Sequence, residues 1–264
     1  MSIEINLRGK RALVAGSTQG IGLATAQAMA AAGASCWLLA RNEEALQRTK
    51  DSLSIVSPEQ KHGYLIADFS KAVEVSAAIE QIKAIAPFHI LVNNAGGPAP
   101  GPITEATEEA FLAAYQQHLL VNHRLVQALL PGMRAQQYGR IINIISTSVR
   151  IPLPNLGVSN TTRAAVAAWA KTLSNELAKD SITVNNILPG LTETARLASL
   201  IRTEAAAKGI SEQTMADQMR ASVPARRFAD ASEPAQLACF LASPLAAYIT
   251  GVSIPVDGGR TGSI

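Results

Sequence analysis

The stretch RALVAGSTQGIGLATAQAMAAAG, from Arg11 to Gly33, decides the fold. Its first six residues form a short apolar run that predicts a buried β-strand, and the run ends at Gly16. A glycine-rich turn follows, and the apolar residues after Gly22 recur with helical spacing until Gly33, a residue typical of a helix C-terminus. The stretch therefore predicts one strand-turn-helix unit with glycines at the turn.

The rest of the chain repeats this rhythm. Further apolar runs predict six more strands, at 35–40, 64–68, 89–96, 139–146, 181–190 and 251–259. Helices are expected between them, at 43–53, 70–86, 105–135 and from about 159 to 178. Strands that are apolar throughout are buried on both faces, as in a parallel sheet covered by helices. We therefore expect one doubly wound Rossmann domain spanning 1–264, with a seven-stranded parallel sheet and a helical lid at about 191–228 formed by one or two amphipathic helices.

Composition narrows the class of protein. The chain has 264 residues, 48% of them hydrophobic and 16% charged, with a net charge of +3. Its basic residues are interspersed with acidic ones, which argues against nucleic-acid binding. The two cysteines, Cys36 and Cys239, lie in apolar runs and are interpreted as core residues, and no metal site is predicted. No apolar run is long enough to cross a membrane, so a cytoplasmic protein is expected.

The first turn has the properties of a phosphate-binding loop. Glycines permit a tight turn, and the following helix N-terminus offers free N–H groups and a positive dipole end to a phosphate. After the second strand the chain has Arg41 where a protein selective for NAD would place an acid. An arginine there suits the 2′-phosphate of NADP(H), although a solvated arginine at a helix start is the alternative. Asp68 and Phe69, after the third strand, are predicted to meet the adenine.

With these residues in view, the chain resembles the short-chain dehydrogenase/reductase family, of the type that includes bacterial 3-oxoacyl-carrier-protein reductases. The resemblance rests on the glycines of the first turn, Asp68, Asn93-Asn94-Ala95-Gly96, Ser146, Pro189-Gly190 with Thr194, and Val256-Asp257-Gly258-Gly259. It implies a hydride transfer between a nicotinamide and a carbonyl or alcohol, with NADP(H) favoured over NAD(H). The predicted cofactor-binding residues are Gly16, Ser17, Thr18, Gly20, Ile21, Gly22, Arg41, Asp68, Phe69, Asn94, Ala95, Gly96, Arg163, Pro189, Gly190 and Thr194.

The family's catalytic side chains are an asparagine, a serine and a Tyr-x-x-x-Lys pair, and this chain departs from that pattern. Ser146 matches the serine, but Ser159 and Arg163 stand at the tyrosine and lysine positions, and His118 at the asparagine position. An aliphatic hydroxyl is a much weaker acid than a phenol, and arginine does not release its proton. Our hypothesis is that His118 supplies the carbonyl proton, through Ser159 or a water in the space of the missing tyrosine, while Ser146 orients the substrate and Arg163 holds the ribose.

Less specific interpretations stay open for these residues. Tyr115, about one helical turn before His118, is a second candidate acid, but both are also explained as packed helix residues, and Ser159 as the N-terminal cap of its helix. Three functions stay open: a carbonyl reductase or alcohol dehydrogenase with a rearranged proton path, an NADP(H)-binding protein of the same fold with little or no turnover and a regulatory or assembly role, and an enzyme that carries out non-redox chemistry with a bound cofactor.

The resemblance also suggests partners. A small-molecule or acyl-thioester carbonyl substrate is expected, and the arginines of the lid segment (Arg196, Arg202, Arg220, Arg226 and Arg227) are compatible with an acidic one. The resemblance further implies a homo-tetramer or dimer paired through the 105–135 and 157–178 helices.

Overall fold

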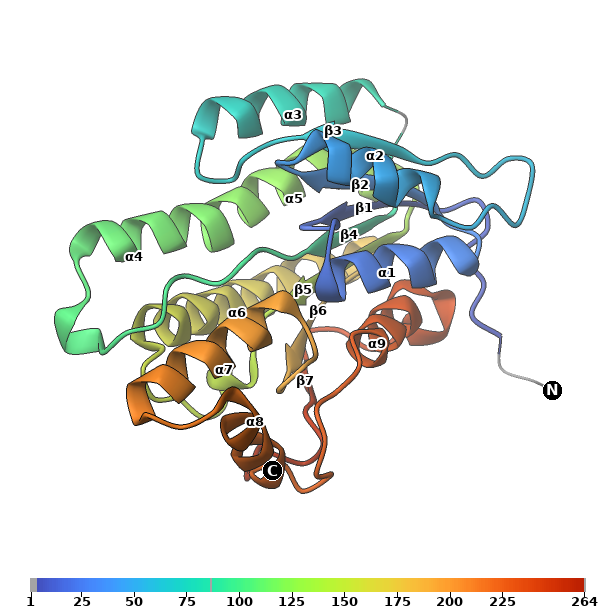
Figure 1. The fold of residues 1–264 in the computed structure, drawn as a ribbon. Helices are drawn as coiled ribbons and strands as arrows, with labels where there is room; N and C mark the ends of the chain where they lie inside the picture. The colour runs from blue at the N-terminus through green and yellow to red at the C-terminus, as the bar shows by residue number, and fades with distance from the viewer. Residues whose placement is uncertain (1–3, 86, 264) are drawn as a thin grey trace.

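The computed structural model of the chain describes residues 4–85 and 87–263 and contains one parallel seven-stranded sheet. The strands lie in the order β3-β2-β1-β4-β5-β6-β7 (Figure 1). Their bounds are β1 Arg11–Ala15, β2 Ser35–Ala40, β3 Gly63–Ile66, β4 Ile90–Asn93, β5 Gly139–Ile144, β6 Ile182–Pro189 and β7 Ser253–Val256. The predicted single-domain Rossmann fold is confirmed.

Helices cover both faces of this sheet. Their bounds are α1 Gly20–Ala31, α2 Glu43–Asp51, α3 Ala72–Ala84, α4 Glu108–Tyr115, α5 Val121–Ala135, α6 Gly157–Leu177, α7 Ala195–Lys208, α8 Glu212–Ala221 and α9 Ser232–Ala242. Helices α1, α2 and α9 share a core with Ala12 and Val14, while α3, α5 and α6 share one with Leu13 on the opposite face of β1. Because successive strand residues point to opposite faces, a strand covered on both sides must be apolar at every position.

The reversal of strand order lies between β1 and β4, since the chain moves outward to β3 from β1 and then returns to the other side. In open sheets of this kind a crevice forms at the C-terminal ends of the two strands that flank the reversal. The loops that follow β1 and β4 therefore meet there, and they carry the glycine-rich turn and the segment Asn94–Gly97.

A row of buried amides ties the four strands on one side of that crevice together. Asn93 Nδ2 donates to Asn143 Oδ1 (2.8 Å), and Asn143 Nδ2 donates to Asn186 Oδ1 (2.9 Å). Asn186 Nδ2 in turn donates to Ser253 Oγ (3.0 Å). Since a buried amide without a partner is costly, this row fixes the register of β4, β5, β6 and β7 at the ends that bear the site.

Several predicted elements differ in their bounds. The strands predicted at 89–96 and 251–259 are shorter, and the helix predicted at 70–86 runs from Ala72 to Ala84. That predicted helix and the predicted domain 1–264 include residues 1–3, 86 and 264, which lie outside the described residues. Cys36 and Cys239 are buried, as predicted.

The long helix predicted at about 105–135 is present from Glu108 to Ala135, but it begins three residues later than predicted and contains a π-helical turn. A 3₁₀ turn at Ile103–Glu105 precedes α4, and a π-helical turn (η2, Gln116–Leu120) separates α4 from α5. A π turn adds one residue to the helix and so rotates every later side chain relative to the earlier ones. Apolar spacing alone does not reveal such an insertion.

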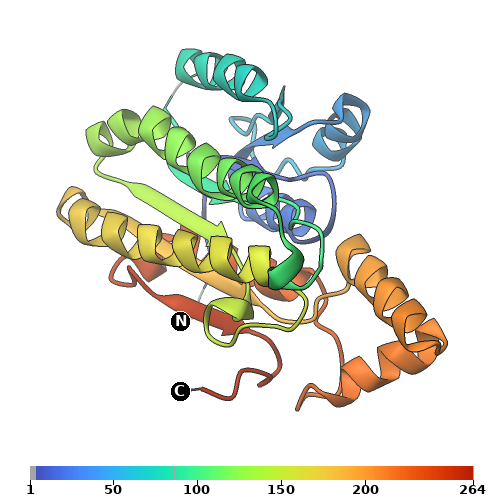
Figure 2. The same ribbon diagram turned by 90° about the vertical axis from the view of Figure 1, so that its left-hand side faces the viewer.

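The segment between β6 and α9 forms two helices, α7 and α8, which project beyond one end of the sheet (Figure 2). They have a small apolar core of their own, built on Leu197, Ile201, Met215 and Phe228. Within the described part of the chain, no helix is both long and apolar enough to span a bilayer.

Candidate active site

A cavity of about 540 Å³ opens at the C-terminal ends of the strands around the β1/β4 reversal. Most of the predicted site residues line it: Gly16, Thr18, Gly20, Ile21, Arg41, Asp68, Phe69, Asn94, Ala95, Gly96, Ser146, Ser159, Arg163, Pro189, Gly190 and Thr194. Three predicted residues, Ser17, Gly22 and His118, do not line it. Residues from the segments that follow six of the strands therefore line one cavity.

The glycine-rich turn is built by close backbone approach. Gly16 and Gly20 have φ values of +57° and +54°, which favour glycine. A Cβ on Gly22 would lie 2.1 Å from the Gly16 carbonyl oxygen, so only glycine fits there. Asn94 Nδ2 donates to that same oxygen (3.0 Å) and joins this turn to the loop after β4. Gly22 therefore permits the close packing of the turn and does not face the cavity.

Ser17 is fully buried, and its hydroxyl has no hydrogen-bond partner among the described residues. Its side chain does not line the cavity, and the cofactor contact predicted for Ser17 stays a prediction. The side chain of Thr18, by contrast, borders the cavity at the N-terminus of α1. The sequence distinguishes these two neighbours poorly, because both are small polar residues of one turn.

The far end of the cavity carries the charged pair predicted to meet the adenosine. Arg41 is exposed after β2, and Asp68 accepts hydrogen bonds from the Ser70 backbone N–H (2.9 Å) and hydroxyl (2.7 Å). These hydrogen bonds, and the charge of Arg41, lower the pKa of Asp68 below its ordinary value. Asp68 is therefore an ionised acceptor beside an arginine that makes no ion pair within the described structure.

The opposite end is formed by Ser146, Ser159 and Arg163. Ser146 Oγ accepts from the Ser148 backbone N–H (3.1 Å), which leaves its hydroxyl proton free to be donated into the cavity. Arg163 Nε donates to Ser159 Oγ (3.2 Å), and Arg163 Nη1 donates to the Ile145 carbonyl (2.8 Å). Ser159 and Arg163 are one turn apart on α6, so their side chains reach the same wall.

The alternative interpretation of Ser159 as a helix cap is wrong. Helix α6 begins at Gly157, its N-cap residue is Leu156, and no side chain caps it. Ser159 is already inside the first turn and is 7% exposed. Its hydroxyl instead contacts the Arg163 guanidinium, and of the polar stretch 159–163 Ser159 and Arg163 line the cavity.

His118 lies in the π-helical turn and is 6% exposed. Burial first, and then the charge of Arg163, lower the pKa of its ring to about 3, although a hydrogen bond to the Gly96 backbone opposes the shift. The ring is consequently uncharged at neutral pH and has no acidic proton to release. Gln117, the preceding residue in the same π turn, lines the cavity instead. Tyr115 does not line the cavity either.

The pH dependence of the free energy of unfolding is expected to show that the His118 ring is buried and neutral. In the unfolded chain the ring has an ordinary pKa near 6.5, against about 3 when folded. Below pH 6.5 the unfolded state binds a proton that the folded state excludes, so the free energy of unfolding falls by up to ~1.4 kcal/mol per pH unit toward pH 3. Above pH 6.5 the ring is neutral in both states, so it adds no pH dependence to the free energy of unfolding. Urea unfolding of His118→Gln between pH 7 and 4 should show a shallower slope than the wild type.

His89 provides an internal reference for that experiment. Burial, and the charges of Lys10 and Arg11, lower the pKa of His89 to about 4, and its ring stays in both proteins. Identical pH slopes for the wild type and His118→Gln would contradict a neutral, buried His118.

Several cavity residues were not named as site residues from the sequence. They include Gln19, Gln117, Thr192, Arg196 and Arg260. Gln19 stands inside the glycine-rich turn and Arg260 directly after the Asp257-Gly258-Gly259 motif, so nearness to a motif would have found both. Nothing in the sequence marks Gln117 or Thr192.

Comparison with known proteins agrees with this geometry. A sequence model of the family described as enoyl-(acyl carrier protein) reductase matches residues 15–261. The chain belongs to the short-chain dehydrogenase/reductase family and is an oxidoreductase of that family.

Individual relatives span nearly the whole chain. The NADPH-dependent reductase BacG of Bacillus subtilis (strain 168) is 30% identical over 256 residues, covering 97% of this chain and 99% of that protein. The 3-oxoacyl-[acyl-carrier-protein] reductase FabG of Escherichia coli (strain K12) is 33% identical over 258 residues, with 97% and 98% covered. The crystal structure of L-sorbose reductase from Gluconobacter frateurii, complexed with NADPH and L-sorbose, superposes with a TM-score of 0.92 at 32% identity, covering 99% and 100%.

Proposed function

We propose that the protein is an NADP(H)-dependent reductase that transfers hydride between the nicotinamide and a carbonyl or alcohol substrate. One observation carries the proposal: a single cavity joins the glycine-rich turn and Arg41 at one end to Ser146, Ser159 and Arg163 at the other. Similarity to reductases whose names or complexes include NADPH supports this cofactor. Similarity to named reductases also favours an enzyme over a binding protein with little turnover.

The residues present fit this cofactor. The turn Gly16–Gly22 presents backbone N–H groups at the N-terminus of α1, where a pyrophosphate binds favourably. Arg41, unpaired within the described residues and lacking a neighbouring acid on β2, suits a 2′-phosphate. When bound, NADPH supplies the hydride, and the remaining chemistry belongs to the protein.

In this proposal the protein handles the carbonyl oxygen with hydroxyls and a fixed cation. Ser146 donates its free hydroxyl proton as a hydrogen bond to the oxygen, and Arg163 stabilises the negative charge that develops there. The pKa of Arg163 is lowered to about 10 by burial and by Arg196, so the group stays protonated at neutral pH. A water hydrogen-bonded to Ser159, in the space that a longer tyrosine would fill, delivers the proton.

His118 has a different part in this proposal from the one predicted. A neutral ring bonded to the Gly96 backbone is a poor proton donor, so we assign it the positioning of the Asn94–Gly97 loop. Replacing His118 should then weaken the binding of substrate and cofactor. The pKa values seen in the pH profile of kcat should change less. A profile that loses an ionisation in His118→Gln would restore the imidazole as the acid.

The Arg41→Ala variant tests the cofactor assignment. We expect the dissociation constant for NADPH, measured by nucleotide fluorescence, to rise ~10- to 100-fold, because charge-assisted hydrogen bonds to a phosphate are lost. The constant for NADH should change less than about twofold, since NADH has no 2′-phosphate. The matched control is Arg48→Ala, an exposed arginine on α2 that does not line the cavity. Equal losses for both nucleotides would contradict the assignment.

Turnover is tested with the same protein samples. NADPH oxidation is followed with ketones, aldehydes and 3-oxoacyl thioesters, and the reverse reaction with the corresponding alcohols. Tight NADPH binding with turnover on at least one carbonyl supports the enzyme. Tight binding with no turnover on the panel would favour the alternative, a nucleotide-binding protein with a regulatory or assembly role.

We also propose a cytoplasmic homo-oligomer, dimer or tetramer, and a lid function for residues 191–228. Helices α4 and α6 pack side by side (Figure 2). Leu112 on α4 and Leu120 in the π turn are exposed. Burial of such side chains favours association through this face. Light scattering of the purified protein gives the oligomeric state directly, and a monomer would refute this part.

A further inference from the structure

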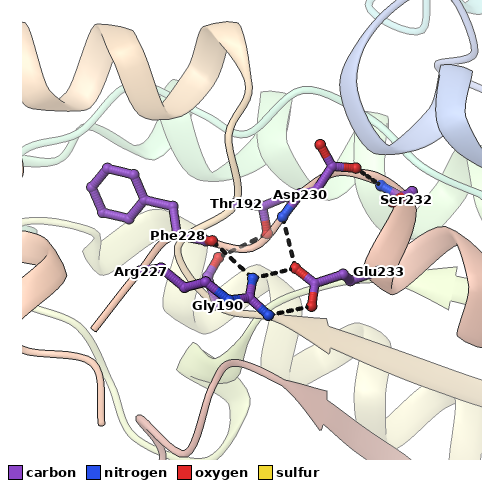
Figure 3. A network of polar contacts seen from close by, with 7 residues as sticks. All are labelled: Gly190, Thr192, Arg227, Phe228, Asp230, Ser232 and Glu233. Carbon is purple, nitrogen blue, oxygen red and sulfur yellow. Dashed lines mark hydrogen bonds and ion pairs between the residues drawn. The ribbon is translucent and has the colours of Figure 1, made fainter. Parts of the chain in front are cut away.

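The arginines of the lid segment differ sharply in what they contact. Three of them make ion pairs: Arg202 with Glu212 (3.6 Å), Arg220 with Asp217 (2.8 Å) and Arg227 with Glu233 (2.6 Å). The last pair is bidentate and lowers the pKa of Glu233 to about 2, and it ties the end of the segment to α9 (Figure 3). Arg226 donates to the Ala221 carbonyl (2.7 Å). All four therefore have partners away from the cavity, three of them within the lid segment and the fourth, Arg227, on α9.

Arg196 is the exception. It lies in the first turn of α7, lines the cavity and donates Nη2 to the Pro98 carbonyl in the loop after β4 (2.7 Å). None of the described carboxylates forms an ion pair with it. Arg196 is exposed, and its side chain reaches from the lid to the loop after β4 at the edge of the cavity, where no described carboxylate neutralises its charge.

Arg163 approaches the same point from α6. A Cβ built on Gly97 would lie 3.4 Å from Arg163 Nη2 and 3.6 Å from Arg196 Nη2, so both guanidinium groups converge on this glycine. Their repulsion contributes to the lowered pKa of Arg163. The one carboxylate that lines the cavity, among the described residues, is Asp68 at the adenosine end. Two unneutralised cations held this close favour an anion between them.

The positions of Arg163 and Arg196 place this bound anion away from the turn that would bind the cofactor phosphates. Thr194, which caps α7, lies over the glycine-rich turn, with its methyl group 3.0 Å from a Cβ built on Gly20. The Arg196 side chain extends away from that turn. It donates to the Pro98 carbonyl, on the side of the cavity that carries Ser159 and Arg163. The two cations accordingly belong to the half of the cavity where the proposed reaction occurs.

We propose that the substrate is a small oxo acid whose carboxylate is bound by Arg196, beside Arg163, while its carbonyl faces Ser146. The inference rests on the proposed function and narrows its substrate class. In the reaction, hydride adds to the carbonyl carbon, the oxygen takes a proton from solvent, and NADPH becomes NADP⁺. The carboxylate itself does not react. It fixes the carbonyl by a charge-assisted, bidentate contact, for which arginine is suited.

The test measures binding, so it does not depend on turnover. Calorimetry of the full chain saturated with NADP⁺ compares 2-oxobutanoate and 3-oxobutanoate with their methyl esters. At least one acid should bind ~10-fold or more tightly than its ester, and Arg196→Gln should remove that difference while leaving the ester unchanged. The control Arg202→Gln, on the same helix but paired outside the cavity, should behave as the wild type.

Two results would overturn the inference. One is that no acid binds better than its ester to the wild type. The other is that Arg196→Gln weakens NADP⁺ rather than acid binding, which would assign the arginine to the cofactor phosphates. If an acid bound selectively but was never reduced, the proposed reductase function would be refuted and the anion site would still be supported.

Discussion

Gly22→Ala is expected to raise the dissociation constant for NADPH by about 100-fold or more, because the shape of the phosphate-binding turn depends on it. The added methyl would lie 2.1 Å from the Gly16 carbonyl oxygen and 2.7 Å from Asn94 Nδ2. Neither contact is tolerable, so the turn must move away from α1 and the Asn94-to-Gly16 hydrogen bond must break. Overpacking of this kind also costs ~1–3 kcal/mol of folding free energy.

The measurement separates the two effects of Gly22→Ala. Nucleotide fluorescence gives the affinity, and thermal unfolding shows whether the variant is folded at the assay temperature. Gly262→Ala is the matched control, because a Cβ there has no neighbour within 4 Å. A folded Gly22→Ala protein with wild-type NADPH affinity would refute the role of the turn.

Ser146→Ala should lower kcat by about 100-fold or more, because it removes a hydrogen bond aimed at the oxygen that becomes negative. The hydroxyl accepts from the Ser148 N–H, so its proton is directed to the cavity and is not used within the protein. NADPH affinity should remain within about twofold of the wild type, since the hydrogen bond goes to the substrate. Single-turnover kinetics on any carbonyl that the wild type reduces would measure the change.

Ser148→Ala is the control for this experiment. Ser148 lies in the same 3₁₀ turn, does not line the cavity, and its buried Oγ has no partner among the described residues. Its removal should leave kcat almost unchanged. Equal kcat values for Ser146→Ala and the wild type would remove Ser146 from the reaction and favour stabilisation of the oxygen by Arg163 alone.

The candidate site was only partly predictable. Motif spacing located the turn, Asp68, Asn94 and Ser146, since each stands directly after a strand and parallel strands end at one edge. The spacing did not separate residues that face the cavity from residues that support it, as Gly22 and Ser17 illustrate. His118 shows the same limit, because it is buried in the π turn while the neighbouring Gln117 lines the cavity.

The amino-acid sequence by itself determined the layered fold. Uniformly apolar strands such as RALVA need cover on both faces, and glycines at a strand-helix turn leave room for a phosphate. Only the tertiary structure decided which charges remain unpaired. Arg196 and Arg202 are six residues apart on one helix, yet one donates to the Pro98 carbonyl in the loop after β4 and the other pairs with Glu212. Ion pairing depends on distances between elements far apart in the chain, and these distances exist only once the sheet, α6 and α7 have packed together.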